Sequence, residues 1–174
     1  YKRKTVHRYM TDIGLEGLWP VNKTFDEDIR LYGRDLEWLG ERKGDNYERS
    51  NMMTTDDTAR LLYLLWRRAV VDFDACGEML ELLHRHKDKS STFFSKVVPE
   101  DWTLYSKSGF TGTTRHDAGI LETPGGEGAV IIVAFSKNRN MGEDDDYPQV
   151  IEHAAELVLQ ELMNQNGVLD EVKE

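Results

Sequence analysis

Cysteine and long apolar runs are nearly absent from this sequence of 174 residues. The single cysteine, Cys76, cannot form an internal disulfide, and its helix-like surroundings favour a small buried apolar side chain over a nucleophile. The longest strongly apolar stretch, Ala129–Phe135, has the length of a strand and falls well short of the ~20 residues that span a bilayer. The sequence therefore predicts neither a disulfide scaffold nor a membrane-spanning helix within these residues.

Basic residues are also scarce, with 22 Lys and Arg against 32 Asp and Glu and a formal net charge of −10. A strongly negative surface repels phosphate backbones, so a nucleic-acid partner is disfavoured. An apolar fraction of 39%, with four Trp and six Phe, is enough for an ordinary core and argues against disorder. The length fits one domain or a large part of one.

The first half of the chain predicts helices separated by a long irregular segment. The spacing of Val6, Tyr9, Met10 and Ile13 predicts a helix that ends near Gly14. Residues 14–53 show no period and are punctuated by glycines, and a loop of that length is often functional. The pattern then changes at Thr54, a hydroxyl residue followed by two acids, which is typical of a helix N-terminus.

Two helical stripes follow this N-terminus. The first predicts a buried face made of Ala59, Leu62, Tyr63, Trp66 and Val70. The second helix is predicted from Phe73 to His86, with a core made of Met79, Leu80, Leu82 and Leu83.

From residue 101 the period becomes two, which predicts strands. Three stretches, "WTLYSKSGF", "TRHDAGILET" and "GAVIIVAFS", are joined by short turns that contain Gly, so they predict an antiparallel meander. A final helix is predicted from Pro148 to Met163, packed on this sheet through Val150, Ile151, Ala154, Leu157, Val158 and Leu162. Helices followed by strands and one more helix indicate an α+β fold.

These residues carry a resemblance to a known family. "SKSG" on a strand, "GTT" opening the next strand and "AGIL" after it resemble the C-terminal sheet of class A β-lactamases and related penicillin-recognising serine hydrolases, whose third motif is K-[ST]-G. "NMMTTDDTARLL" is similar to the stretch that leaves the family's Ω-loop, and "VHRYMTDIGL" resembles the helix after its S-D-N motif. The resemblance covers most of residues 5–163.

The resemblance implies a β-lactamase/transpeptidase-like fold with two parts. Residues 1–100 would be part of the helical subdomain with an Ω-like loop at about 14–53, and residues 101–174 would be the C-terminal part of the α/β subdomain. The implied activity is hydrolysis of a β-lactam or related amide or ester through an acyl-enzyme, with a small-molecule or peptidoglycan-like substrate. No cofactor or metal is implied, and the family's usual location implies a periplasmic or secreted protein.

The K-[ST]-G strand implies specific roles. Lys107 would lie beside the nucleophile as an electrostatic and proton-network element, and Ser108 would donate a hydrogen bond to the substrate's carboxylate. Gly109 would let the substrate approach the backbone closely, since it has no side chain. The backbone N–H of Phe110 would be one oxyanion donor.

Further site positions follow from the same resemblance. Thr113 and Arg115 are implied to bind substrate, although Arg115 also fits an exposed salt-bridging residue. Glu37 and Glu41 lie where the Ω-loop acid of class A enzymes is expected, but neither has that acid's usual sequence context. They also fit two solvated loop carboxylates.

The family's nucleophile has no counterpart in the sequence. It lies in an S-x-x-K motif, and none of the seven serines has Lys three residues on. Ser136-Lys137-Asn138 matches S-x-N only formally, because it follows the third strand. Because Tyr1 is not Met, we expect that residues upstream, the missing N-terminal segment, supply S-x-x-K and S-x-N. The alternative is a non-catalytic binding or scaffold domain with the β-lactamase fold.

Overall fold

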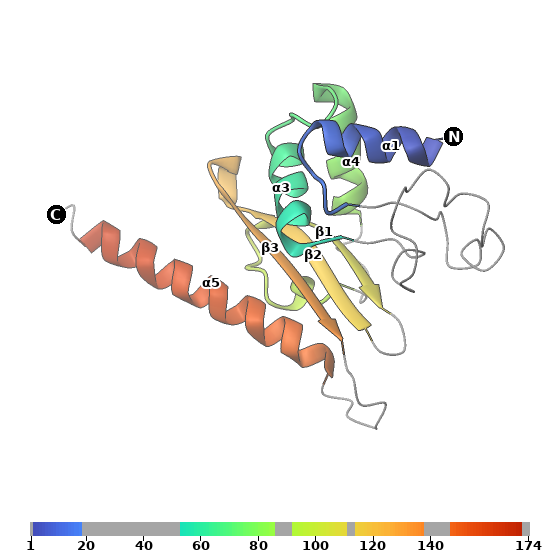
Figure 1. The fold of residues 1–174 in the computed structure, drawn as a ribbon. Coiled ribbons are helices and arrows are strands. Elements are labelled where there is room, and N and C mark those ends of the chain that lie inside the picture. Colours follow the sequence, from blue (N-terminus) through green and yellow to red (C-terminus); the bar gives the residue numbers. More distant parts are fainter. Residues whose placement is uncertain (1, 19–52, 86–91, 111–113, 138–146, 172–174) are drawn as a thin grey trace. The chain divides into compact units, whose positions relative to one another are not determined.

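The structure is a computed structural model that describes residues 2–18, 53–85, 92–110, 114–137 and 147–171 (Figure 1). The chain divides into two compact units, Tyr1–Leu61 and Leu62–Glu174. Glu37, Glu41 and Thr113 lie outside the described residues, as does most of the expected Ω-like loop. In the described residues no helix is long and apolar enough to cross a membrane.

The first unit is built from α1 (Lys2–Asp12) and the start of α3 (Thr55–Trp66). The predicted stop after α1 is confirmed, since Gly14 has φ +80°, a conformation that favours glycine. The predicted α1 stripe is only partly buried, because Val6 and Tyr9 are exposed. The Gly17 N–H donates to Asp57 Oδ2 at 2.5 Å, which ties the segment after α1 to α3.

Helix α3 begins as predicted. Thr54 Oγ1 accepts from the Asp57 N–H at 3.1 Å, so Thr54 caps the N-terminus. Its predicted buried stripe was wrong in part, because Tyr63 is exposed and Leu65 is buried instead. The helix ends at Trp66, after which Arg68 takes a left-handed φ of 58° that closes the last turn.

Helix α4 (Phe73–His84) begins where the sequence predicts, with Asp72 as the N-cap accepting from the Ala75 N–H at 2.8 Å. Its buried residues are Cys76 and Leu80. The burial predicted for Cys76 is confirmed, whereas Leu82 is exposed, so the predicted core face was wrong at that position.

The predicted antiparallel meander is confirmed, and the chain has the α+β fold that was expected. Strands β1 (Thr103–Phe110), β2 (Thr114–Glu122) and β3 (Ala129–Lys137) form a sheet in the order β1-β2-β3, as Figure 1 shows. The short 3₁₀ helix η4 (Pro124–Gly126) joins β2 to β3, with positive φ at Gly125 and Gly126.

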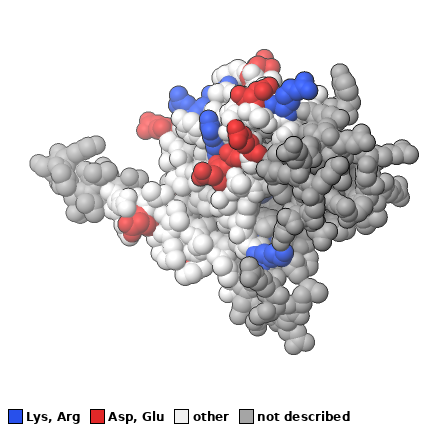
Figure 2. Space-filling model, viewed as in Figure 1, with Lys and Arg blue, Asp and Glu red and all other residues white. Residues whose placement is uncertain are grey.

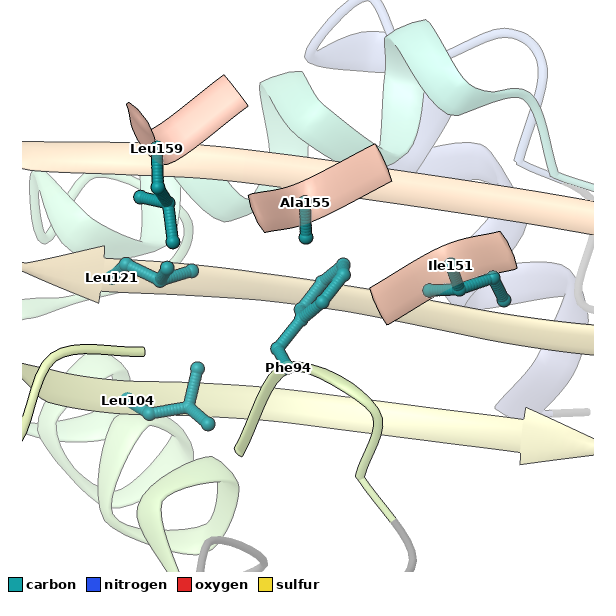
Figure 3. Close-up of a cluster of buried hydrophobic side chains, with 6 residues drawn as sticks. All are labelled: Phe94, Leu104, Leu121, Ile151, Ala155 and Leu159. Atoms are coloured by element: carbon teal, nitrogen blue, oxygen red, sulfur yellow. The ribbon is translucent and has the colours of Figure 1, made fainter. Parts of the chain in front are cut away.

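Helix α5 (Tyr147–Glu171) packs on one face of this sheet together with the 3₁₀ helix η3 (Phe94–Lys96). Figure 3 shows Phe94 pointing from η3 towards α5 across the sheet. The cluster consists of Phe94, Leu104, Leu121, Ile151, Ala155 and Leu159. The predicted packing of the last helix is confirmed, but most of its predicted face was wrong, since Val150, Ala154, Leu157 and Val158 are exposed.

Figure 2 shows Lys and Arg side chains lying next to Asp and Glu over one part of the described surface. Much of the remaining described surface on this face carries no charge. The net negative charge of the sequence is therefore not displayed there as one acidic patch.

Candidate active site

Strand β1 is an edge strand within the described residues, because it pairs with β2 and lies at one end of the sheet order. An edge strand leaves a row of backbone N–H and C=O groups available to a ligand. Lys107, Ser108 and Gly109 lie near the C-terminal end of this strand, followed by Phe110. The sequence thus places the whole K-S-G stretch, and the backbone of Phe110, on an accessible strand edge.

Lys107 is exposed, and its ammonium group donates a hydrogen bond to the carbonyl oxygen of Ser108. Gly109 lies next to open space: among the described residues no atom would come within 4 Å of a Cβ added there. An exposed cation beside an unobstructed strand edge can attract and hold a carboxylate.

Ser108 lies on the other face of β1, because successive side chains of a strand alternate. It is 7% exposed and pairs directly with Asp117 of β2. Lys107 and Ser108 can therefore contact one ligand only if that ligand lies along the outer edge of the strand.

Asp117 is a fully buried carboxyl group on the core face of β2. Its Oδ2 accepts from the backbone N–H groups of Phe93 at 2.7 Å and Phe94 at 3.1 Å. Burial raises the pKa of Asp117 to about 6, opposed by hydrogen bonds from the Phe94, Phe93 and Ala118 N–H groups and by the charge of Lys107. The carboxyl group thereby fixes η3 beneath the strand pair that carries Lys107.

Sequence reasoning missed Asp117, although a signal for it existed. Period-two alternation backwards from Leu121 through Gly119 places Asp117 on the core face of β2. A carboxyl group on such a face needs buried partners, and η3 supplies them.

The face of the sheet opposite the core carries a second polar group of residues. Glu122 accepts from Trp66 Nε1 at 2.8 Å through one oxygen and from the Tyr105 hydroxyl at 3.2 Å through the other. Burial, together with the charge and hydrogen bond of Glu122, raises the pKa of Tyr105. The positive charge of Arg68 offsets part of this increase. These bonds tie the start of β1 to β2 and to the end of α3.

His116 lies on the same face as Lys107, opposite Gly109. Its Nδ1 accepts from the Ser136 N–H at 3.3 Å, and its ring meets Phe135 edge-on at 4.9 Å. Burial lowers the pKa of His116, and a hydrogen bond to the backbone of Arg115 offsets part of this decrease. A ring that accepts at Nδ1 is neutral, so His116 adds no positive charge beside Lys107.

Arg115 is half-buried and lies opposite Phe110, two positions from Asp117 on the same face of β2. Its Nη1 donates to the Thr114 carbonyl oxygen at 2.8 Å. Its guanidinium group is thus close to the end of β1, and its substrate-binding role stays a prediction.

His84 is the last residue of α4 and contacts β1. Its Nδ1 donates to the Leu104 carbonyl oxygen at 3.1 Å, and its ring lies 5.6 Å from that of Tyr105. In the part of the chain that the structure describes, no group of three or more His, Cys, Asp or Glu could hold a metal ion.

Comparison with known proteins identifies the family. The sequence profile of the β-lactamase enzyme family matches residues 2–162, which is nearly the whole chain. The chain belongs to the β-lactamase enzyme family. No curated protein matches it.

Solved structures of β-lactamases share the fold. A halotolerant bacterial β-lactamase is 26% identical to this chain, with a TM-score of 0.66. The match covers 92% of this chain and 56% of that protein. The β-lactamase of Sphaerobacter thermophilus is 20% identical with a TM-score of 0.63, at 88% and 52% coverage. The chromosome-encoded enzyme of Vibrio parahaemolyticus is 15% identical with a TM-score of 0.68, at 92% and 55%. This β-lactamase family chain thus spans about half the length of these proteins.

Proposed function

We propose that this β-lactamase family chain belongs to a serine hydrolase that opens a β-lactam, or a related amide or ester, through an acyl-enzyme. The observation that carries the proposal is the exposed Lys107 beside Gly109, which no described residue crowds, on the strand β1, an edge strand within the described residues. Acyl transfer needs an anchor for the substrate's carboxylate and a donor for the oxyanion, and such an edge offers both.

Each residue of the edge has a role in this proposal. Lys107 supplies positive charge to the substrate's carboxylate and to the proton transfers of acylation. Ser108 donates a hydrogen bond to the carboxylate from the outer edge of the strand, and Arg115 of β2 and Thr113 assist in binding it. Gly109 leaves room for the substrate, and the Phe110 N–H donates to the oxyanion.

The nucleophile of the proposed reaction is a serine outside these 174 residues, since no serine here is followed by Lys at the required spacing. Its hydroxyl oxygen bonds to the substrate's carbonyl carbon, the C–N or C–O bond breaks, and the leaving group takes the hydroxyl proton. Water then hydrolyses the ester and regenerates the serine, with Glu37 or Glu41 as the candidate base. By likeness to its family, the protein would act in the periplasm or outside the cell.

The test is to incubate the full-length protein with a fluorescent penicillin and to measure the intact mass. A covalent adduct of the mass of the penicillin, chased away with time by hydrolysis, is the expected result. The absence of any adduct, together with no turnover of any acyl ester, would refute the hydrolase.

A second candidate is a binding or scaffold domain that keeps the fold without the chemistry. The observation that favours it is the lack of S-x-x-K in the sequence. The coding sequence before Tyr1 discriminates the two. S-x-x-K followed by S-x-N some tens of residues upstream supports the hydrolase, and a start codon directly before Tyr1 supports the scaffold.

A further inference from the structure

Three buried polar side-chain atoms near Ser108 have no hydrogen-bond partner among the described residues. They are Asp117 Oδ1, Ser106 Oγ and Thr92 Oγ1. The three residues are at most 1% exposed. They come from three separate segments, namely β2, β1 and the stretch that leads into η3. Leaving buried polar atoms unpaired is costly, so a shared partner that satisfies all three would stabilise the fold.

The sheet register brings two of these atoms to one face. Ser106 pairs with Gly119 and Ser108 with Asp117, so Ser106 and Asp117 are diagonal neighbours on the core face. Diagonal neighbours of an antiparallel pair have Cα atoms roughly 7–8 Å apart, with Cβ atoms somewhat closer. Two hydrogen bonds of about 2.8 Å through one oxygen span such a gap.

The hydrogen bonds of Asp117 bring the backbone that directly follows Thr92 to the same place. Asp117 Oδ2 accepts from the N–H groups of Phe93 and Phe94, the two residues after Thr92. The Phe94 ring also lies beside Ser106, since a Cβ added at Gly119 would lie 3.0 Å from Ser106 Cβ and 3.2 Å from Phe94 Cδ2. Figure 3 shows the Phe94 ring directed from η3 towards α5, where it is part of the apolar cluster.

The chemistry of the three atoms selects their partner. The two hydroxyl groups donate and the carboxylate oxygen accepts, and all lie too deep for bulk solvent. Buried water typically makes about three hydrogen bonds to such otherwise unsatisfied groups. One water can accept from both hydroxyls and donate to the carboxylate.

We propose that Thr92, Ser106 and Asp117 form an internal water-binding site beneath Ser108. The bound water joins β1 to η3 through Asp117, and this holds the strand edge at Lys107 and Gly109 in place. Water binding stands independently of the proposed function. The inference that the bound water positions Lys107 and Gly109 for catalysis rests on the proposed function.

A high-resolution crystal structure of the full-length protein tests the site directly. We expect a solvent peak about 2.7–3.2 Å from all three oxygen atoms. A direct hydrogen bond between Ser106 Oγ and Asp117 Oδ1 without such a peak would overturn the proposal. A peak at about 2.3–2.6 Å from the oxygens would overturn it too, because that distance is typical of a bound cation such as Ca²⁺.

A double-mutant cycle in the full-length protein gives a second test that does not need Asp117 to be changed. Ser106→Ala and Thr92→Val each remove one ligand of the water, so each should lower the melting temperature by about 2–4 °C. Their combined effect should fall short of the sum, since the two hydroxyls share one partner. Additive effects would contradict a shared water. Ser136→Ala, which removes a hydroxyl bonded to the Arg115 carbonyl at the far side of the sheet, is the matched control and should add to either variant.

The positioning role is tested by acylation measured per folded molecule. Asp117→Ala should slow acylation by a fluorescent penicillin by roughly 10- to 100-fold, because a displaced edge misplaces the substrate. Asp117→Asn keeps an acceptor for the two N–H groups and should restore most of the rate. Equal rates in wild type and Asp117→Ala would remove the positioning role and leave the water site standing. If the wild type forms no adduct, the hydrolase fails instead, and the crystal structure still decides the water site.

Discussion

The two faces of the three-stranded sheet differ in what they do for β1. The face towards α5 is closed by Phe94, Leu104 and Leu121, with Asp117 buried beside them. On the opposite face Lys107 is exposed and Tyr105 is only half-buried, and Glu122 holds hydrogen bonds there. On that face Ile120, which pairs with Tyr105, is also fully buried, so only the Lys107 end of β1 is left accessible there. A strand fixed on both faces with one accessible end suits a rigid wall of a substrate site.

The largest effect should come from the closed face. Phe94→Ala removes a fully buried ring at the centre of the α5 cluster, so it should lower the free energy of unfolding by about 3–5 kcal/mol. Urea denaturation of the full-length protein measures this. Phe73→Ala is the control: the ring is 70% exposed and contacts Arg68, so its loss should cost less than about 1 kcal/mol. Equal losses in the two variants would contradict the core described for this face.

The next effect is the pH dependence contributed by Asp117. Its folded-state pKa of about 6 lies above the ordinary value of 3.8, so the folded protein binds the proton more tightly than the unfolded chain. This contribution to stability is fully present below about pH 4 and is lost as the pH rises to about 6, in total about 3 kcal/mol. Asp117→Asn cannot titrate.

The free energy of unfolding of Asp117→Asn, measured relative to wild type, should therefore rise between pH 4 and pH 7 by about 3 kcal/mol. Denaturant titrations of both proteins at each pH give this difference. A difference that stays constant over the range would show that the carboxyl group is not buried as described.

The smallest effect concerns the face opposite α5. Glu122→Gln leaves only one acceptor for the Trp66 and Tyr105 donors, so it should cost about 1–2 kcal/mol of stability at neutral pH. It should also lower the pKa of Tyr105 towards 10, leaving the part of the rise that comes from burial. Absorbance titration of tyrosinate reports the pKa. Glu127→Gln, at an exposed turn, is the control, and an equal shift there would rule out the Glu122 contact as its cause.

The sheet could be predicted from the sequence, because alternating apolar residues indicate strands and the short Gly-containing segments between them indicate antiparallel connections. The buried faces of the helices could not. In α5 the apolar residues lie on several sides of the helix, so the helical period does not indicate which side is buried. Packing on the sheet buries only a narrow stripe made of Ile151, Ala155 and Leu159.

The candidate site was predictable to a similar extent. The strand that carries K-S-G could be predicted from its alternation, whereas its role as a candidate site was implied by the resemblance to the β-lactamase family. The buried partners of Asp117 could not be predicted, because η3 comes from a segment some twenty residues earlier whose contact with β2 is a tertiary event. Thr113, Glu37 and Glu41 stay predictions.

The central claim is that the open edge at Lys107 takes part in acyl transfer. The most direct measurement is the second-order rate constant for acylation of the full-length protein by a fluorescent penicillin, compared between wild type, Lys107→Ala and Lys137→Ala. Both lysines are exposed on strands, so neither change should alter stability by more than about 0.5 kcal/mol. We predict a loss of at least about 100-fold for Lys107→Ala alone. Equal rates in all three proteins would contradict the role given to this edge.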